Sequence, residues 1–439
     1  MLFAPPAVLV NAAAAAEGTP ISALLASLVA VIVTTKLLGE VAQRVGQPAV
    51  LGELLAGVLL GVSLLGILDP QDPVIHAFAE IGVLVLLFEI GLHTDLASLI
   101  RVGPAALAVG ATGVVLPFVM GYGVATLFGL ANLPAIVAGA ALTATSIGIS
   151  ARVLSDLGRL ETPEGQIVLG AAVLDDIIGL IILSVVSGLA SGVALSVGGV
   201  ALTTAVAVGF IVAALAIGSR FVPPLFRLVE HIRVSGALGL IALAFAFAMA
   251  WLAAVSGSAM IIGAFAAGLV LHGTPQRREI ERSTTALGLF FVPIFFAAVG
   301  AAVDLRTLAD ARVLAIGGVL VVVAIVGKFA AGYAPWWFEG HKALIGVAMI
   351  PRGEVGLIYA QMGLRTGALD TALFSALTLM VMATTFVAPP LLSRLAGKPA
   401  RPHSPTDRPG DGGIDDLVSG MRDPQAERRK GDRRAPAPS

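Results

Sequence analysis

Long apolar stretches follow one another along most of the chain, separated by short segments that carry charges, Pro or Gly. A helix that crosses a lipid bilayer needs about 20 consecutive, mostly apolar residues, and the pattern predicts thirteen such spans. We therefore expect an all-α polytopic membrane protein. The predicted spans cover residues 20–43, 48–66, 74–93, 104–130, 133–154, 164–190, 195–218, 236–255, 258–273, 284–301, 312–334, 341–364 and 370–393.

The composition agrees with this pattern and excludes several classes of protein. Of the 439 residues, 57% are hydrophobic and 13% are charged, whereas soluble domains carry about 25% charge. A soluble enzyme and a disordered chain are excluded as leading interpretations. The formal net charge of -1 gives no bulk attraction to nucleic acid. Because there is no cysteine, disulfides, thiolate metal sites and thiol catalysis are excluded.

The two ends of the chain are expected to lie on opposite sides of the membrane. Residues 1–19 are interpreted as an extracytoplasmic tail, with a cleaved signal peptide as the alternative. With the N-terminus outside, eleven Lys and Arg residues, Arg152 among them, fall in inner loops and three in outer loops, which favours an N-outside, C-inside orientation. Residues 394–439, rich in Pro, Gly, Asp and Arg, are expected to form a disordered cytoplasmic tail.

Two adjacent acids lie deep in the sixth predicted span. Asp175 and Asp176 occur in AAVLDDIIGLIIL, and adjacent side chains on a helix point about 100° apart. One carboxylate can therefore face a cavity while the other faces a neighbouring helix. A charge at mid-membrane costs at least about 2.5 kcal/mol, so we expect at least one of the two to bind a cation, pair with a base or hold a proton. A polar patch that only fixes helix packing is the alternative.

Lys328 lies near the middle of the eleventh span, in VVAIVGKFAAG. From there it cannot easily extend to water, so it needs an anionic partner or must lose its proton. The deep acids Asp175 and Asp176 are the obvious partners, and a pair with one of them is the arrangement of lowest free energy. The alternative is a pair that serves helix packing alone.

Two spans contain signals of a broken helix. The fifth includes LTATSIGIS, whose polar residues Thr145 and Ser146 offer oxygen ligands for a small cation. The twelfth includes IPRGEVGLI, where a Pro and a Gly flank Arg352 and Glu354 follows. Arg352 and Glu354 can balance each other or bind freed backbone groups, either as scaffold or in transport. If spans 1–6 and 8–13 are two repeats, the breaks correspond, which indicates an inverted-repeat transporter.

Other acids within the spans are interpreted less specifically. Glu53, Glu80 and Glu89 lie near span ends, or where a helix interface can form, and are expected to be interface or funnel residues. No H-E-x-x-H spacing occurs, so a zinc site is not expected, and no G-x-x-x-x-G-K-[ST] occurs, so the chain carries no P-loop for ATP.

Several of these motifs together resemble cation:proton antiporter family 2, and most closely its bacterial NapA-type sodium/proton antiporters. The resemblance rests on LGAAVLDDIIGLIIL, TATSIGISARVL, VPIFFAAVGAAVDL, AIVGKFAAG and PRGEVGLI, in this order, between about residues 31 and 390. It implies an antiporter rather than an enzyme, located in the bacterial inner membrane. The protein would use no cofactor, carry Na⁺ and protons, and act as a homodimer without a nucleic-acid partner.

The resemblance also implies a role for each site residue. Asp176 would be the main carrier of cation and proton, and Asp175 would pair with Lys328. Thr145 and Ser146 match polar residues beside the site. Arg352 and Glu354 match a charged pair near the second break.

The resemblance further implies a division of the transmembrane domain, residues 20–393. Two inverted six-helix repeats would form a mobile core domain and a dimerisation domain, with two broken helices crossing in the core. The expected core helices lie at about 104–190 and 312–393, the dimerisation helices at about 20–93 and 236–301, and the linking helix at about 195–218.

Alternative functions remain open at this stage. A potassium/proton antiporter is the nearest, because the sequence barely separates the two cations. A cation channel is more remote. An intramembrane aspartyl protease needs its two aspartates on different helices, and no G-x-G-D occurs here.

Overall fold

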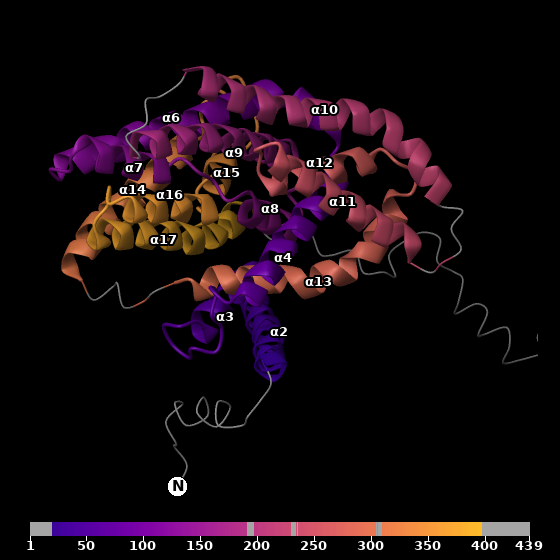
Figure 1. Cartoon of the computed structure of the whole chain (residues 1–439), viewed down its shortest axis with the longest axis horizontal. Helices are drawn as coiled ribbons and strands as arrows, with labels where there is room; N and C mark the ends of the chain where they lie inside the picture. Colours follow the sequence, from indigo (N-terminus) through magenta and orange to yellow (C-terminus); the bar gives the residue numbers. More distant parts are fainter. Residues whose placement is uncertain are drawn as a thin grey trace, which may run out of the picture. The chain divides into compact units, whose positions relative to one another are not determined.

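The computed structural model describes residues 20–190, 197–229, 234, 236–303, 305 and 310–396. Within these ranges every long element is an α-helix (Figure 1). The predicted tail over 1–19, and residues 397–439 of the predicted C-terminal tail, lie outside the described residues. The first three residues of that predicted tail, 394–396, are helical, so the last helix extends beyond the predicted span. The helices are α2 (Pro20–Arg44), α3 (Ala49–Leu60), α4 (Pro73–His93), α5 (Leu96–Arg101), α6 (Gly103–Leu127), α7 (Asn132–Ala141), α8 (Ile147–Asp156), α9 (Pro163–Ala190), α10 (Val197–Val229), α11 (Ala237–Val255), α12 (Met260–His272), α13 (Arg277–Ala301), α14 (Ala311–Ala331), α15 (Lys342–Ala348), α16 (Glu354–Arg365) and α17 (Thr371–Ala396).

The helices have the length and composition of membrane spans. In the part of the chain that the structure describes, nine helices are long and apolar enough to cross a bilayer. Three shorter apolar helices, α3, α7 and α12, accompany them. Each range predicted as a span overlaps at least one helix. The all-α membrane class predicted from the sequence is confirmed.

Some boundaries differ from the prediction, for local reasons. The range 48–66 is helical only to Leu60, because Gly61 turns to an extended conformation and its Cα packs so closely on α13 that a Cβ would lie 2.7 Å from Ala301 Cα. Arg152, counted as a loop residue, lies within α8. α13 likewise begins with its arginines, at Arg277. Charge alone did not mark the helix ends, because a long basic side chain can leave an apolar layer while its backbone stays helical.

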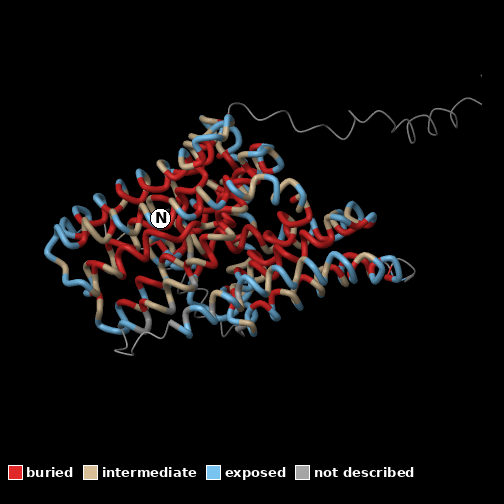
Figure 2. The backbone as a smooth tube through the Cα atoms, turned by 90° about the horizontal axis from the view of Figure 1, so that it is seen from above, coloured by how far each residue is buried: buried red, intermediate tan, exposed pale blue. Residues whose placement is uncertain are grey.

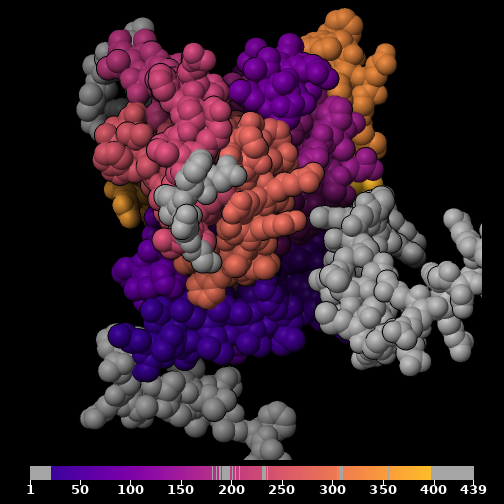
Figure 3. Space-filling view, turned by 90° about the vertical axis from the view of Figure 1, so that its right-hand side faces the viewer, coloured from indigo at the N-terminus to yellow at the C-terminus, as the bar shows by residue number. Residues whose placement is uncertain are grey.

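The helices pack chiefly in two groups. In the first, α4 packs against α12 and α13, α3 against α2 and α13, and α11 against α12 and α13. In the second, α14 packs against α6 and α17, α6 against α7 and α9, and α16 against α7 and α17. Figure 1 shows α14, α16 and α17 gathered on one side and α11 to α13 on the other, with α4 and α8 between them. In Figure 3, the indigo residues of α2 and α3 lie against the coral residues of α13.

Burial is concentrated where the helices meet, and the outer faces of several helices are exposed (Figure 2). The exposed side chains on α2 and α10 include large apolar residues such as Leu25, Val29, Val212 and Phe221. Such faces suit contact with lipid tails. The buried polar residues, which a bilayer cannot satisfy, are therefore the ones to examine for function.

Candidate ion-binding site

Two interrupted helices meet beside α9. α7 ends at Ala141 and α8 begins at Ile147, while α15 ends at Ala348 and α16 begins at Glu354. The backbone N–H of Ser146 donates a hydrogen bond to the Pro351 carbonyl across 2.8 Å, which joins the two breaks. The helix breaks predicted from polar residues and from Pro and Gly are therefore present.

Gly353 allows this close approach. A Cβ at this position would lie 2.8 Å from Ser146 Oγ and 2.9 Å from Ser146 Cβ, closer than real Cβ contacts. The backbone of Gly353 is extended, at φ -132° and ψ -152°, so space and not conformation demands glycine here. The contact leaves no room for a side chain between the breaks.

Asp175 is held by two donors. Its Oδ2 accepts hydrogen bonds from Lys328 Nζ and from Thr145 Oγ1, each at 2.5 Å. Asp175 is 2% exposed and Lys328 is 0% exposed. Asp175 lies in α9, Lys328 lies in α14, and Thr145 lies in the break between α7 and α8. Asp175 Oδ1 has no hydrogen-bond partner among the described residues.

Lys328 reaches Asp175 through a gap that α6 leaves open. A Cβ at Gly113 would lie 3.2 Å from Lys328 Nζ, so the glycine lets the ammonium group pass beside the α6 backbone. The buried ammonium is thereby compensated by the Asp175 carboxylate instead of by water.

Asp176 faces a different environment from its neighbour. It is 7% exposed and lines a cavity of about 490 Å³ together with Gly179, Met260 and Gln361. It also lines a cavity of about 30 Å³ with Thr145 and Ser146, roughly the share of volume that one water molecule takes in the liquid. The two adjacent carboxylates thus point in different directions, as expected for neighbours on a helix: Asp175 contacts Lys328 and Thr145, and Asp176 lines the cavities. Asp176 is positioned to exchange an ion with the large cavity.

Arg352 supports the crossing from within. It is 0% exposed, and its Nη1 donates to the Ala144 carbonyl in the first break at 3.0 Å, while Nη2 is 3.4 Å from the Ala324 carbonyl of α14. Its described hydrogen bonds therefore go to two backbone carbonyls, that of Ala144 in the break and that of Ala324 within α14. The side chain of Glu354 lies outside the described residues, so its predicted pairing with Arg352 stays a prediction.

Three hydroxyl groups that were not assigned such roles from the sequence fix the crossing. Thr385 Oγ1 donates to the Arg352 carbonyl at 2.6 Å, and Ser150 Oγ donates to the Ala348 carbonyl at 2.6 Å. Tyr359 donates to the Gly179 carbonyl at 2.6 Å, on the helix that carries the acids. Hydroxyl groups are common in apolar helices, so only their tertiary contacts distinguish these three.

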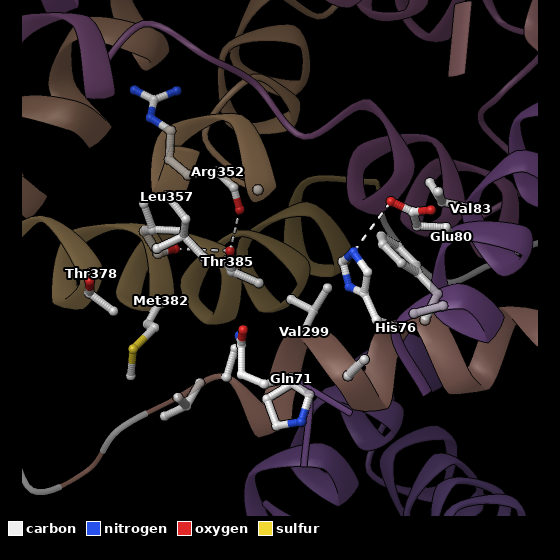
Figure 4. A pocket seen from close by; sticks show the side chains of 18 of the residues that line it. Gln71, His76, Glu80, Val83, Val299, Arg352, Leu357, Thr378, Met382 and Thr385 are labelled. Carbon is white, nitrogen blue, oxygen red and sulfur yellow. Dashed lines mark hydrogen bonds and ion pairs between the residues drawn. The ribbon is translucent and has the colours of Figure 1, made fainter. Parts of the chain in front are cut away.

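A histidine and a glutamate pair with each other at the wall of the large cavity. His76 Nε2 lies 3.3 Å from Glu80 Oε1, and both residues line the large cavity beside Asp176 and a second cavity of about 160 Å³. Figure 4 shows His76 turned toward Glu80, and the Arg352 guanidinium turned away from this pocket while its carbonyl meets Thr385. The route from the α4 end of the cavity to Asp176 therefore passes a carboxylate.

The described residues contain no group of three or more His, Asp or Glu side chains suited to holding a metal ion. The site instead offers the single carboxylate of Asp176 beside the hydroxyl groups of Thr145 and Ser146. Such a set suits a loosely held monovalent cation or a proton. The carrier role of Asp176 stays a prediction at this point.

Comparison with known proteins identifies the family. The family described as "Sodium/hydrogen exchanger, transmembrane" matches residues 21–398. The high-affinity Na⁺/H⁺ antiporter NhaS3 of Synechocystis is 42% identical over 432 residues, covering 89% of this chain and 94% of that protein. The Na⁺/H⁺-K⁺ antiporter GerN of Bacillus cereus is 34% identical over 372 residues, covering 84% and 95% of the two chains.

A solved structure agrees at the level of the fold. The sodium proton antiporter MjNhaP1 of Methanocaldococcus jannaschii superposes with a TM-score of 0.68 at 17% identity, over 86% of this chain and 98% of that one. The family match over most of the chain and the identity to NhaS3 lead to one conclusion. This chain belongs to the sodium/hydrogen exchanger family.

Proposed function

We propose that this protein is a secondary active antiporter that exchanges Na⁺, or Li⁺, for protons across the cell membrane, with Asp176 as the carrier. One observation carries the assignment. Asp176 lines the large cavity, while the adjacent Asp175 is occupied by Lys328 and Thr145. The names of the relatives NhaS3 and GerN, both antiporters, support the same reaction.

Coupling follows from competition for one carboxylate. Asp176 binds either a cation or a proton, so the two ions use the same carrier in opposite directions. An empty, ionised Asp176 is costly to move through an apolar barrier. That cost suppresses leak and restricts movement to the loaded states.

The buried pair beside the carrier makes the exchange electrogenic. Lys328 and Asp175 form an ion pair whose charged atoms lie 2.5 Å apart, next to Asp176. A cation bound at Asp176 therefore adds positive charge beside the Lys328 ammonium group. We propose that the cation weakens this pair and that Lys328 then loses its proton. More than one proton would move per cation, and the titrations of the three groups would be coupled.

The architecture proposed from the sequence gives this site its movement. Thirteen membrane helices form two inverted six-helix repeats, and the two breaks fall in the fifth and twelfth helices. The core helices at about 104–190 and 312–393 move against the dimerisation helices at about 20–93 and 236–301, with 195–218 as the linker. The packing of the helices in two groups supports this division.

The assembly and its place in the cell are part of the same proposal. Two copies would associate in the bacterial inner membrane, with the N-terminus outside and the C-terminus in the cytoplasm. Bacterial antiporters among the relatives support the cell membrane as the location.

A potassium/proton antiporter is the second candidate. GerN is named a Na⁺/H⁺-K⁺ antiporter, and KhtU of Bacillus subtilis, 32% identical over 342 residues, is named as a subunit of a K⁺/H⁺ antiporter. The polar groups that line the small cavity beside Asp176 are the hydroxyl groups of Thr145 and Ser146 and the carboxyl group of Asp176 itself. These oxygen ligands suit Na⁺ and K⁺ alike.

Transport in liposomes tests both candidates. Purified protein is reconstituted with an acid interior and a trapped pH dye, and Na⁺, Li⁺ or K⁺ is added with and without a clamped membrane potential. Alkalinisation by Na⁺ or Li⁺ that requires Asp176 supports the proposal. A response to K⁺ alone changes the substrate, and retained cation-dependent proton movement in Asp176→Asn removes the carrier assignment.

A further inference from the structure

A second group of charges, in which Glu53 is buried and the other members are partly exposed, lies outside the Lys328–Asp175 pair. Arg152 of α8 contacts Asp156 of the same helix, with Nε and Oδ1 3.1 Å apart, and Glu53 of α3, with Nη2 and Oε1 3.9 Å apart. Glu89 of α4 also acts on Arg152 electrostatically. We call Glu53, Glu89, Arg152 and Asp156 the latch cluster. It joins α8, which continues from the first break, to α3 and α4 in the other helix group.

The latch cluster contains more negative than positive groups. The carboxylates of Glu53 and Asp156 contact the guanidinium, that of Glu89 acts on it electrostatically, and Glu53 is only 3% exposed. Among the described residues, Glu53 Oε2, Glu89 Oε1 and Asp156 Oδ2 are buried without a hydrogen-bond partner. An ionised carboxylate that is buried and unpaired is strongly disfavoured. One arginine cannot compensate three such groups.

The neighbouring helices do not supply the missing positive charge. Lys36 of α2 acts on Glu53 but is exposed. On α4 and α13, His93 and Glu281 pair with each other at 3.1 Å. The Glu89 carboxylate lies against the α13 backbone, where a Cβ at Gly288 would come within 2.6 Å of Oε1. Protons neutralise such carboxylates where they stand and need no further ligand.

The latch cluster closes the side opposite the open cavity. The cavity beside Asp176 is lined by His76 and Glu80 near the start of α4, whereas Glu89 lies near the end of the same helix. Glu89 lies nine positions after Glu80 in the helix, a rise of about 13.5 Å at 1.5 Å per residue. In addition, Asp156 lies near the Val50 backbone N–H at the start of α3. Access from that side therefore requires α8 to separate from α3 and α4.

We infer that the latch cluster is a proton-binding latch: protons on Glu53, Glu89 and Asp156 hold α8 against α3 and α4, and loss of these protons releases it. The inference rests on the proposed antiport in one respect: opening of the latch is taken to expose the carrier Asp176 to the membrane side opposite the open cavity. The protonated acids are neutral and stay buried around Arg152. Once ionised, they gain hydration by separating.

The direction of the pH effect follows from linkage. The closed latch binds more protons than the open one, so acid favours closure and alkali favours opening. Each proton released on opening changes the open-to-closed ratio by up to a factor of about ten per pH unit. Glu53→Gln resembles the protonated acid at every pH. The variant therefore releases one proton fewer on opening, and its open-to-closed ratio changes less steeply with pH.

Cysteine labelling measures the opening without any transport. The chain has no cysteine of its own. Val50, which is 0% exposed at the contact of α3 with Asp156, is replaced in Val50→Cys, and the exposed Val45 in Val45→Cys supplies the reference rate at each pH. The ratio of the two maleimide rates is expected to rise with pH, and to rise less steeply when Glu53→Gln is added. A ratio independent of pH, or a rise unchanged by Glu53→Gln, overturns the latch.

Transport provides the second readout, with a matched control. Exchange by Glu53→Gln is expected to equal that of the native protein at acid pH and to fall progressively behind as the pH rises. The control is Glu40→Gln, which removes an exposed acid that pairs with Arg44, and its profile should follow the native one. A uniform loss at every pH marks Glu53 as merely structural and overturns the inference. If Asp176→Asn still transports but the labelling ratio responds as expected, the proposed carrier fails and the latch stands.

Discussion

Lys328 Nζ donates to Asp175 Oδ2 across 2.5 Å, and neither side chain is exposed to any extent. Removing one member of such a pair leaves a buried charge without compensation, which costs about 3–5 kcal/mol, whereas replacing both by apolar or neutral groups is close to neutral. The pair is therefore a constraint on stability as well as a part of the ion site, and the two effects need separate measurements.

The Asp175–Lys328 pair can be tested by a double-mutant cycle. Lys328→Met and Asp175→Asn should each lower the unfolding temperature in detergent, and the double variant should recover most of the loss because no buried charge is left alone. Circular dichroism during heating checks this. Additive losses in the double variant would show that the two groups act independently.

Lys328 should also affect the current carried per exchange. Lys328→Ala is expected to weaken the current on a solid-supported membrane more than it weakens cation binding, since the lysine would no longer release a proton. Lys342→Ala, at the start of α15 and bonded to the Trp336 carbonyl, is the control. An unchanged current in Lys328→Ala contradicts the proton-releasing role.

Asp176→Asn should abolish exchange while the protein remains folded. The amide retains the size of the carboxyl group but cannot exchange a proton or balance a cation. Proton movement in liposomes should fall to the level of protein-free vesicles. Asp69→Asn, an exposed aspartate in the loop before α4, should keep the native rate.

Gly353→Ala should disturb the crossing without unfolding the protein. Its Cβ would lie 2.8 Å from Ser146 Oγ, so the two breaks must move apart and exchange should fall. Gly318→Ala, where a Cβ meets nothing within 4 Å, serves as the matched control in α14. Adding Ser146→Gly should restore part of the lost exchange. Lack of any rescue would mean that the contact with Ser146 is not the cause.

Arg352→Lys should lower the thermal stability of the protein although it keeps the positive charge. The guanidinium reaches the Ala144 and Ala324 carbonyls together, and a lysine has no planar fork to do so. The Ala144 carbonyl lies in the break, so loss of its donor costs about 1–3 kcal/mol, whereas the Ala324 carbonyl keeps its bond within α14. Thermal unfolding should fall for Arg352→Lys and remain native for Arg365→Lys, which lies in the last turn of α16. Equal effects of the two substitutions would remove the special role of Arg352.

The sequence predicted those parts of the site that are scarce in an apolar chain. Charges deep in a span are rare, so Asp175, Asp176 and Lys328 were recognisable, and the breaks followed from local Pro, Gly and hydroxyl residues. The contact of Arg352 with Ala144 joins residues far apart along the chain and has no local signal. The latch cluster was hidden for the same reason, because Arg152 was counted as a loop residue and its acids lie on other helices.

The apposition of the two breaks has an electrostatic consequence. The carboxyl ends of α7 and α15 meet the amino ends of α8 and α16 at the crossing, so two negative and two positive ends of peptide dipoles lie together. Their partial charges cancel in pairs, and the backbone contributes little net charge to the site. The charge of the crossing is therefore set by its side chains and by the occupant of Asp176. Na⁺ and H⁺ carry the same charge, so the two loaded forms of Asp176 are electrically alike. The proposed proton loss from Lys328 then makes the cation-loaded site one positive charge poorer than the proton-loaded site, and the membrane potential acts on the cycle through that lysine.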